Sequence, residues 1–401
     1  MIPTYLDHAA TTYVDPRVLA AMLPFFSDTF ANPSSFHTPG MRAKEAVIAA
    51  RNAIAKALEC RDDEVIFTAG GTESDNLALL GTIRAHAAKG RHVVTTAIEH
   101  HAVLEPLLHL QKKGEIELTI LPVDRHGRVD PDVVAKSLRP DTVLVSIMYA
   151  NNEIGTIQPI ADIGREILKW RKANVTAYPY FHSDACQAAG ACDLGVDRLH
   201  VDLFSVNGSK IYGPKGVGLL YVRRGTKLEP IGRGGGQEKG LRPGTENVPG
   251  IVGLATALSF AQEEKETENP RLIALRERLT KGLLAIPKSI LNGHPTERLP
   301  NSVNVSFLDI EGEAAVLYLD AEGIYVSTGS ACASTSLDPS HVILATGLSY
   351  EAAHGSIRFT LGKRTTDADI GHVLAVMPGV VERLRHMSPV NLDMKYFSLK
   401  P

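Results

Sequence analysis

The sequence has few cysteines, four in 401 residues, and no two of them are spaced as C-x-x-C. Four cysteines are too few for a disulfide framework, and without such a pair they do not indicate a structural metal site. The sequence also lacks any apolar run near the roughly 18 to 20 residues that cross a bilayer. The first residues, MIPTYLDHAATT, have no basic stretch followed by an apolar one, so we expect a cytoplasmic protein that does not enter a membrane.

An excess of charge of either sign is missing as well. Lysine and arginine number 42 against 45 aspartates and glutamates, a formal net charge of -3. Such a balance gives no electrostatic reason to expect nucleic acid or an anionic membrane as a partner. Small molecules and other proteins are the expected partners.

Short apolar, β-branched runs alternate with helical patterns through the first two thirds of the chain. Uninterrupted apolar strands between helices indicate a mostly parallel sheet that is buried on both faces, an α/β architecture. The predicted strands are 65–68, 92–97, 116–121, 142–149, 180–184, 201–206 and 217–222, and the clearest helices are 74–88, 101–112 and 159–172.

The pattern changes after residue 260, where a charged helical stretch is expected to end at Pro270. Downstream, the pattern predicts helix 271–284, strand 302–308, helix 313–321, strands 324–327 and 356–361, and helix 367–385, with 388–401 as a surface tail. We therefore predict a large domain over 15–262 and a smaller α+β domain made of 1–14 and 263–401.

Three segments at the ends of predicted strands have residues suited to chemistry. After strand 65–68, Gly70, Gly71 and Thr72 open a helix, where converging backbone N–H groups suit a phosphate, although the same residues suit an ordinary helix cap. Asp184 ends another strand and could bind a protonated ring nitrogen or cap a helix. Lys210, between Ser209 and Ile211, suits a Schiff base, although most lysines are solvated surface charges.

The order of these segments resembles the class V aminotransferase group of fold-type I pyridoxal-phosphate (PLP) enzymes. Within it, the chain is similar to the group I cysteine desulfurases of the NifS/IscS type, from residue 6 to residue 389. The segments that carry this resemblance are LDHAATT, ANPSS, TESDN, EH, NNEIG, GLRPGTEN and STGSACAS.

The resemblance implies a PLP-dependent transferase of fold type I, with a mostly parallel seven-stranded sheet in the large domain. It implies that Lys210 binds PLP as a Schiff base and moves the substrate α-proton, and that Asp184 pairs with the ring nitrogen. Gln187 corresponds to the partner of the ring hydroxyl. Asn152 lies against ring or substrate, and His100 stacks on the ring and takes part in proton exchange. The neighbouring His101 has no counterpart and is expected to be a packing or surface residue.

For the phosphate, the resemblance implies contacts from Gly71, Thr72, Asn207, Ser209 and Thr245, the last reaching across from the second subunit of a homodimer. The family usually has Ser-Gly-His before the lysine, whereas this chain has Asn207-Gly208-Ser209. Asn and Ser still offer hydrogen bonds, so we expect a rearranged phosphate site.

For the substrate, the resemblance implies that Arg358 binds the carboxylate of L-cysteine, with Asn32 as its helper. An arginine on an interior strand needs a partner for its charge, which agrees with this role.

Cys332 lies within a run of small polar residues, about 326–337, that we expect to be mobile. The resemblance implies that its thiolate takes sulfur from L-cysteine, leaves alanine, and passes the persulfide to an iron–sulfur scaffold protein or a tRNA-thiolation carrier. No resident metal is implied, and at most Cys332 transiently ligates a partner's cluster. Cys60, Cys186 and Cys192 are expected to be packing thiols. The alternatives are a selenocysteine lyase, a class V transaminase, or an inactive PLP-binding partner protein.

Overall fold

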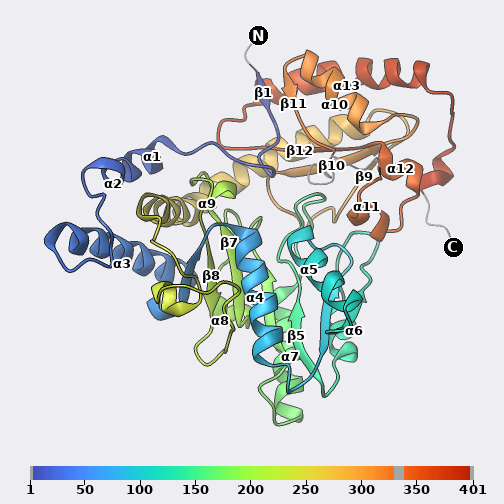
Figure 1. Ribbon diagram of the computed structural model, residues 1–401. Coiled ribbons are helices and arrows are strands. Elements are labelled where there is room, and N and C mark those ends of the chain that lie inside the picture. Colours follow the sequence, from blue (N-terminus) through green and yellow to red (C-terminus); the bar gives the residue numbers. More distant parts are fainter. Residues whose placement is uncertain (1–2, 329–337, 398–401) are drawn as a thin grey trace.

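The computed structural model describes residues 3–328 and 338–397. Figure 1 shows one large sheet with helices on both faces, and a second, smaller sheet above one of its ends. Cys332 and most of the segment about 326–337 lie outside the described residues.

The large sheet has seven strands in the order β2-β8-β7-β6-β5-β3-β4. All neighbours are parallel except β8, which is antiparallel to both β2 and β7. The predicted α/β architecture with a mostly parallel sheet is confirmed. The strands are β2 (Val65–Thr68), β3 (His92–Thr96), β4 (Glu117–Leu121), β5 (Thr142–Ser146), β6 (Tyr180–Asp184), β7 (Leu203–Asn207) and β8 (Gly218–Val222).

Each face of this sheet has its own core, because successive residues of a strand point to opposite faces. On β2, Val65 and Phe67 belong to one cluster, whereas Ile66 belongs to the other. The first cluster includes buried residues of α3 (Thr38–Leu58), α6 (Pro131–Ser137), α7 (Ile160–Ala173) and the first part of α9 (Val248–Leu284). The second includes residues of α4 (Gly71–Ala85) and α5 (His101–Lys112).

The smaller sheet is antiparallel and has the order β12 (Ser356–Thr360), β10 (Ser302–Phe307), β9 (Ser289–Leu291). A short parallel pair, β1 (Thr4–Tyr5) and β11 (Ile324–Tyr325), lies beside it. Leu6 packs in the same core as α10 (Gly312–Ala321) and α13 (Asp367–Met387). The chain start thus belongs to the core formed by the C-terminal third of the protein.

The expected helix end at Pro270 is wrong, because α9 continues through this proline from Val248 to Leu284. Proline removes one backbone hydrogen bond from a helix interior, which ordinarily favours a break. Here the two halves of α9 are held by different cores: Leu258 packs under the large sheet, and Leu275 packs under the small one. Burial on both sides of Pro270 outweighs its local effect.

Several short elements complete the chain, some of which the sequence pattern did not indicate. They are α1 (Pro16–Met22), α2 (Pro24–Ser27), α8 (Val196–Leu199), α11 (His341–Ala345), α12 (Tyr350–His354), the 3-10 turn η5 (Met394–Phe397), and the 3-10 turns at 62–64, 208–210 and 237–240. In the described part of the chain, none of the helices combines the length and the apolar character needed to span a bilayer.

The predicted surface tail is more firmly attached than we expected. Most of residues 388–396 is exposed, but the N–H of Leu392 donates to Asp309 at 2.6 Å. Phe397 is buried against Leu308 and Ala352. Burial of the apolar ring of Phe397 holds this end of the chain to the small sheet. The sequence pattern did not indicate this contact.

Candidate active site

A cavity of about 220 Å³ lies where strands of the large sheet end and helices α4 and α5 begin. It brings together nine predicted site residues, namely Gly71, Thr72, His100, Asn152, Asp184, Gln187, Asn207, Lys210 and Arg358. Among the described residues, Asn32, Ser209 and Thr245 do not line it, and Cys332 is not described. Asn32 and Thr245 are exposed.

One end of the cavity is the start of α4. The helix begins after Gly70, which has a φ of 152° and provides no side-chain cap. The first N–H groups of a helix have no partners inside it, so an uncapped start is a site for an anion. Gly71 is also needed for close packing, because a Cβ there would lie 2.7 Å from Sγ of Cys186.

Asn207 forms the facing wall at this end. Its Oδ1 accepts hydrogen bonds from the backbone N–H and the hydroxyl of Ser209, at 3.1 and 3.2 Å. Asn207 lines the cavity and Ser209 supports it from behind. Both residues were predicted to contact the phosphate. Asn207 lines the cavity, whereas Ser209 does not and contacts Asn207 instead.

Asp184 provides a carboxylate at the end of β6. It is 7% exposed, and its Oδ1 accepts the backbone N–H of Cys186 at 2.8 Å, which fixes its direction. Two further buried acids lie nearby, Asp75 and Glu99. Burial and the charge of Asp184 raise the pKa of Asp75 to about 6. Burial raises the pKa of Glu99 to about 8.

His100 lies at the first turn of α5 and lines the same cavity. Its Nδ1 accepts the backbone N–H of Ala102 at 3.0 Å and thereby caps the helix. Burial lowers the pKa of the ring below its usual value, so the imidazole is neutral at neutral pH. Because Nδ1 acts as an acceptor, the proton of the neutral ring lies on Nε2.

The amine of Lys210 lies against the N-terminal segment. Nζ donates to the carbonyl of Ala9 at 2.9 Å and also to that of Ala10. The side-chain amide of Gln187 donates to the same Ala9 carbonyl at 3.0 Å. One backbone carbonyl from the chain start therefore orients two predicted cofactor residues that are far away in sequence.

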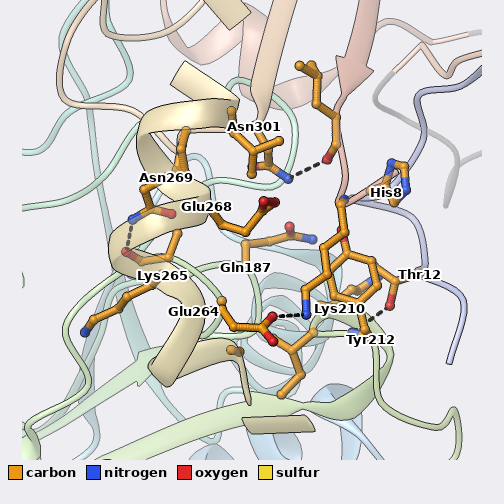
Figure 2. A pocket seen from close by; sticks show the side chains of 18 residues that line it. His8, Thr12, Gln187, Lys210, Tyr212, Glu264, Lys265, Glu268, Asn269 and Asn301 are labelled. Carbon is orange, nitrogen blue, oxygen red and sulfur yellow. Dashed lines mark hydrogen bonds and ion pairs between the residues drawn. The ribbon is translucent and has the colours of Figure 1, made fainter. Parts of the chain in front are cut away.

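A second, smaller cavity of about 70 Å³ shares Gln187 and Lys210 with the first. Figure 2 shows these two side chains together with Tyr212 and with Glu264 and Glu268 of α9. The side chain of Lys210 therefore lines two neighbouring cavities.

Arg358 extends from β12 into the larger cavity, and only 3% of its side chain is exposed. Nη2 donates to Oδ1 of Asp7 at 2.8 Å, and Nη1 donates to the carbonyl of Asn152 at 3.0 Å. Nε is buried and has no hydrogen-bond partner among the described residues. A buried unpartnered donor on a guanidinium favours a ligand with a carboxylate or phosphate.

Sequence reasoning missed the cavity residues Ala9, Ala10, Asp75, Met148 and Cys186. All but Met148 lie in segments already singled out by motif, LDHAATT, TESDN and the run after Asp184. Cys186 was predicted to be a packing thiol. Burial raises its pKa well above its usual value, and its Sγ packs against the start of α4. Cys186 is therefore a neutral thiol that packs in the cavity wall.

These residues fit a flat cofactor with an anionic end and a basic ring nitrogen. An anion can bind at the start of α4 beside Thr72 and Asn207, while the Asp184 carboxylate can pair with a protonated ring nitrogen. Lys210 supplies the amine that a carbonyl cofactor requires, and the guanidinium of Arg358 in the cavity wall suits a substrate anion.

Comparisons with known proteins agree with this arrangement. The model of the aminotransferase class-V family matches residues 4–373. A protein of Methanosarcina thermophila named cysteine desulfurase IscS is 51% identical over 386 residues, which are 96% of this chain and 94% of that protein. One of Archaeoglobus fulgidus named cysteine desulfurase IscS 1 is 48% identical, covering 96% and 99%.

Solved structures of related proteins are also similar to this chain over most of its length. A structure described as a NifS-like protein has a TM-score of 0.88 and 37% identity, and the match covers 95% of this chain and 100% of that one. The structure of DndA from Streptomyces lividans has a TM-score of 0.74 and 41% identity, with coverage of 89% and 99%. The similarity therefore extends over both the large and the small sheet.

Proposed function

The chain belongs to the aminotransferase class-V family and is a PLP-dependent cysteine desulfurase, and from this premise we propose which of its residues perform each part of the reaction. The observation that carries these assignments is the cavity in which Lys210, Asp184, His100 and Arg358 meet. When bound, PLP withdraws electrons from the α-carbon of the amino acid.

Holding the cofactor is assigned to the start of α4 and to the side chains of Asn207, Asp184, Gln187 and Lys210. The uncapped start of α4, with Gly71 and Thr72, binds the phosphate together with Asn207, which Ser209 orients. Asp184 holds a proton on the ring nitrogen, because an ionised carboxylate stabilises the nearby positive charge. Gln187 binds the ring hydroxyl, and Lys210 attaches the cofactor through Nζ.

Proton movement is assigned to Lys210 and His100. Lys210, once displaced by the substrate amine, takes the proton from the α-carbon. His100 lines the cavity where the cofactor ring would lie, and its neutral form carries one proton on Nε2, so it could donate at this position. Arg358 binds the substrate α-carboxylate through its guanidinium, and Asn152, whose carbonyl accepts from Nη1, lies beside it.

The sulfur step is assigned to Cys332. Its thiolate attacks the sulfur of the bound L-cysteine, the carbon–sulfur bond breaks, and the enzyme keeps a persulfide while alanine leaves. The segment that holds Cys332 lies between β11 and α11, and α11 packs against Ile98 and Met148 beside the cavity. The contact of α11, which follows this segment in the chain, with the residues beside the cavity supports the assignment of the sulfur step to Cys332.

A homodimer accounts for two residues that do not line the cavity of their own chain. Asn32 and Thr245 are exposed, and Thr245 is assigned to the phosphate of the second subunit. The surface around Asn32 supports an interface, because Leu23, Phe30 and Phe36 are 57%, 73% and 97% exposed. A contiguous patch of exposed apolar side chains is typical of protein contacts, and we propose that these three residues, which are close in sequence, form one.

The sulfur acceptors are proposed to be proteins of the cytoplasm. The first proposed acceptor is an iron–sulfur scaffold protein that receives the sulfur directly. The second is a carrier for tRNA thiolation. Both proposals rest on the resemblance to cysteine desulfurases that the sequence around Cys332, STGSACAS, carries.

The proposed function is tested by the sulfur on the enzyme. The holoenzyme is incubated with L-cysteine without reductant, alkylated, digested and analysed by mass spectrometry. We expect one extra sulfur atom on the peptide that contains Cys332, and release of alanine in the same sample.

Cys332→Ser and Cys60→Ser serve as matched variants, since Cys60 is another thiol, outside the cavity. Cys332→Ser should lose the persulfide and keep the cofactor colour, and Cys60→Ser should keep both. A persulfide on another cysteine, with the Cys332 peptide unmodified, would contradict the assignment.

A further inference from the structure

The guanidinium of Arg358 already has an anion from the protein itself. Asp7 accepts from Nη2 at 2.8 Å, and this carboxylate is 21% exposed, whereas the arginine side chain is 3% exposed. A guanidinium has five N–H donors and can bind two anions on different edges. Two of the five donors have the partners Asp7 and Asn152, and Nε has no hydrogen-bond partner among the described residues.

The backbone holds this pair together. Asp7 forms an isolated parallel bridge with Thr360, two residues after Arg358 on β12, and the N–H of Thr360 donates to the carbonyl of Leu6 at 2.6 Å. The hydroxyl of Tyr5 donates to the carbonyl of Asp7 at 3.1 Å. The Asp7 carboxylate is therefore a built-in neighbour of Arg358, and its place does not depend on a ligand.

A carboxylate ligand on Arg358 would share one guanidinium with this built-in anion. Two carboxylates on one cation repel each other, and the repulsion is strong where solvent is largely excluded. Removing the charge of Asp7 would remove this repulsion, while the Asn152 carbonyl would still hold Nη1.

We propose that Asp7 is a positioning and affinity-setting residue, an internal anion that orients Arg358 and weakens its binding of the α-carboxylate of substrate and product. The inference rests on the proposed role of Arg358 as the carboxylate site. Alanine has the same α-carboxylate as L-cysteine, so weaker binding speeds release of the product as well as lowering affinity for the substrate. This role differs in sign from that of a merely structural ion pair, whose loss would weaken binding.

The test uses propionate, which has a carboxylate but neither the amine nor the thiol of L-cysteine. Two quantities are measured on the holoenzyme: the inhibition constant of propionate against L-cysteine, and the rise in melting temperature that propionate causes. Propionamide is the uncharged control ligand. For Asp7→Asn we expect an inhibition constant lower by roughly three- to tenfold and a larger rise in melting temperature, with no change for propionamide.

Two further variants make the result specific. Asp7→Ser, also uncharged, should lower the constant in the same direction and replaces Asp7→Asn if the latter does not fold. Tyr5→Phe loosens the same segment but keeps the carboxylate, so it should leave the constant unchanged. An unchanged or higher constant in Asp7→Asn and Asp7→Ser would overturn the inference.

Arg358→Gln separates this inference from the proposed function. It should abolish the effect of propionate on both quantities. If propionate still binds Arg358→Gln as tightly as the unchanged protein, the carboxylate role of Arg358 is wrong. If Arg358→Gln abolishes binding and the Asp7 variants do not strengthen it, only the inference on Asp7 is wrong.

Discussion

The carboxylate of Glu99 lies against the backbone N–H of Met148, with its two oxygens 3.0 and 3.1 Å from that nitrogen. Glu99 has no exposed surface, and the hydroxyl of Thr96 donates to it at 2.5 Å. Burial, with smaller contributions from Asp184 and Asp75, raises the pKa of Glu99 to about 8. A neutral carboxyl group therefore lies directly before His100 in the sequence, behind the cavity wall.

The raised pKa of Glu99 predicts how stability depends on pH. Glu99 in the unfolded chain loses its proton near pH 4.5, whereas the folded protein keeps it until about pH 8. The unfolded state therefore binds fewer protons in this window, so the free energy of unfolding falls as pH rises through it. Glu99→Gln, which stays neutral, should show a smaller fall, by roughly 1–3 kcal/mol between about pH 5 and about pH 8.

Urea unfolding of both proteins at the two pH values measures this difference. Other groups titrate between the same pH values. The contribution of Glu99 is therefore the difference between the falls in the free energy of unfolding of the unchanged protein and of Glu99→Gln. Equal falls in the unchanged protein and in Glu99→Gln would show that Glu99 is ionised in the folded state.

The phosphate end of the cavity gives a second prediction. Ser209→Ala removes the hydroxyl that donates to Oδ1 of Asn207 at 3.2 Å, while the N–H of residue 209 still donates to the same atom. We expect PLP to dissociate a few-fold faster, by roughly the effect of one hydrogen bond, and faster still from Asn207→Ala. The decay of cofactor absorbance after dilution into excess apo-acceptor protein measures the rates.

Ser183→Ala is the control for this pair. The Ser183 hydroxyl is buried, close in sequence to Asp184, and has no hydrogen-bond partner among the described residues, so its removal should leave the dissociation rate unchanged. Dissociation from Ser209→Ala that is no faster than from the unchanged protein would mean that Ser209 does not support phosphate binding.

The lysine assignment can be tested chemically. Borohydride reduction of the holoenzyme should fix the cofactor on the peptide that contains Lys210, and Lys210→Ala should lose both the modified peptide and the bound cofactor colour. Lys215→Ala is the matched variant, because Nζ of Lys215 donates at 3.3 Å to the carbonyl of Thr12, outside the larger cavity. It should behave like the unchanged protein. Cofactor fixed on Lys215 would reverse the assignment.

The proposed dimer predicts an effect at an exposed aromatic residue. Phe36 is 97% exposed, and Phe36→Asp places a charge where the interface is proposed, so the dimer dissociation constant should rise at least roughly tenfold. Val175, 93% exposed at another surface, is the control, and Val175→Asp should leave the constant unchanged. Sedimentation over a range of concentrations gives both values. A monomer in all three proteins would remove the dimer proposal.

Much of the fold could be predicted because its signals are local. Helix His101–Lys112 and strands Val65–Thr68 and Tyr180–Asp184 have the predicted bounds, since uninterrupted apolar runs and helical spacing define them. The end at Pro270 was wrongly predicted because the local effect of proline was weighed without the two cores that hold α9. Phe397, likewise, is one aromatic residue without a periodic pattern.

The candidate site divides in the same way. Asp184 ends strand β6 and Lys210 follows strand β7. The carboxyl ends of neighbouring strands meet at one edge of a sheet, so the meeting of these two residues could be expected from sequence. The contact of Ser209 with Asn207, away from the cavity lining, could not be predicted. Both residues belong to one short motif, and the directions of their side chains depend on packing.

The sequence by itself determined the fold class, the family and most of the residues around the cavity, because these depend on strand and helix patterns and on short motifs. Only the tertiary structure decided which groups neutralise or orient the side chains around the cavity. Asp7 and Arg358 are 351 positions apart, and Ala9 and Lys210 are 201 apart. Such pairs form because burial removes water from polar groups, which must then bind whatever partner the packed chain brings within reach.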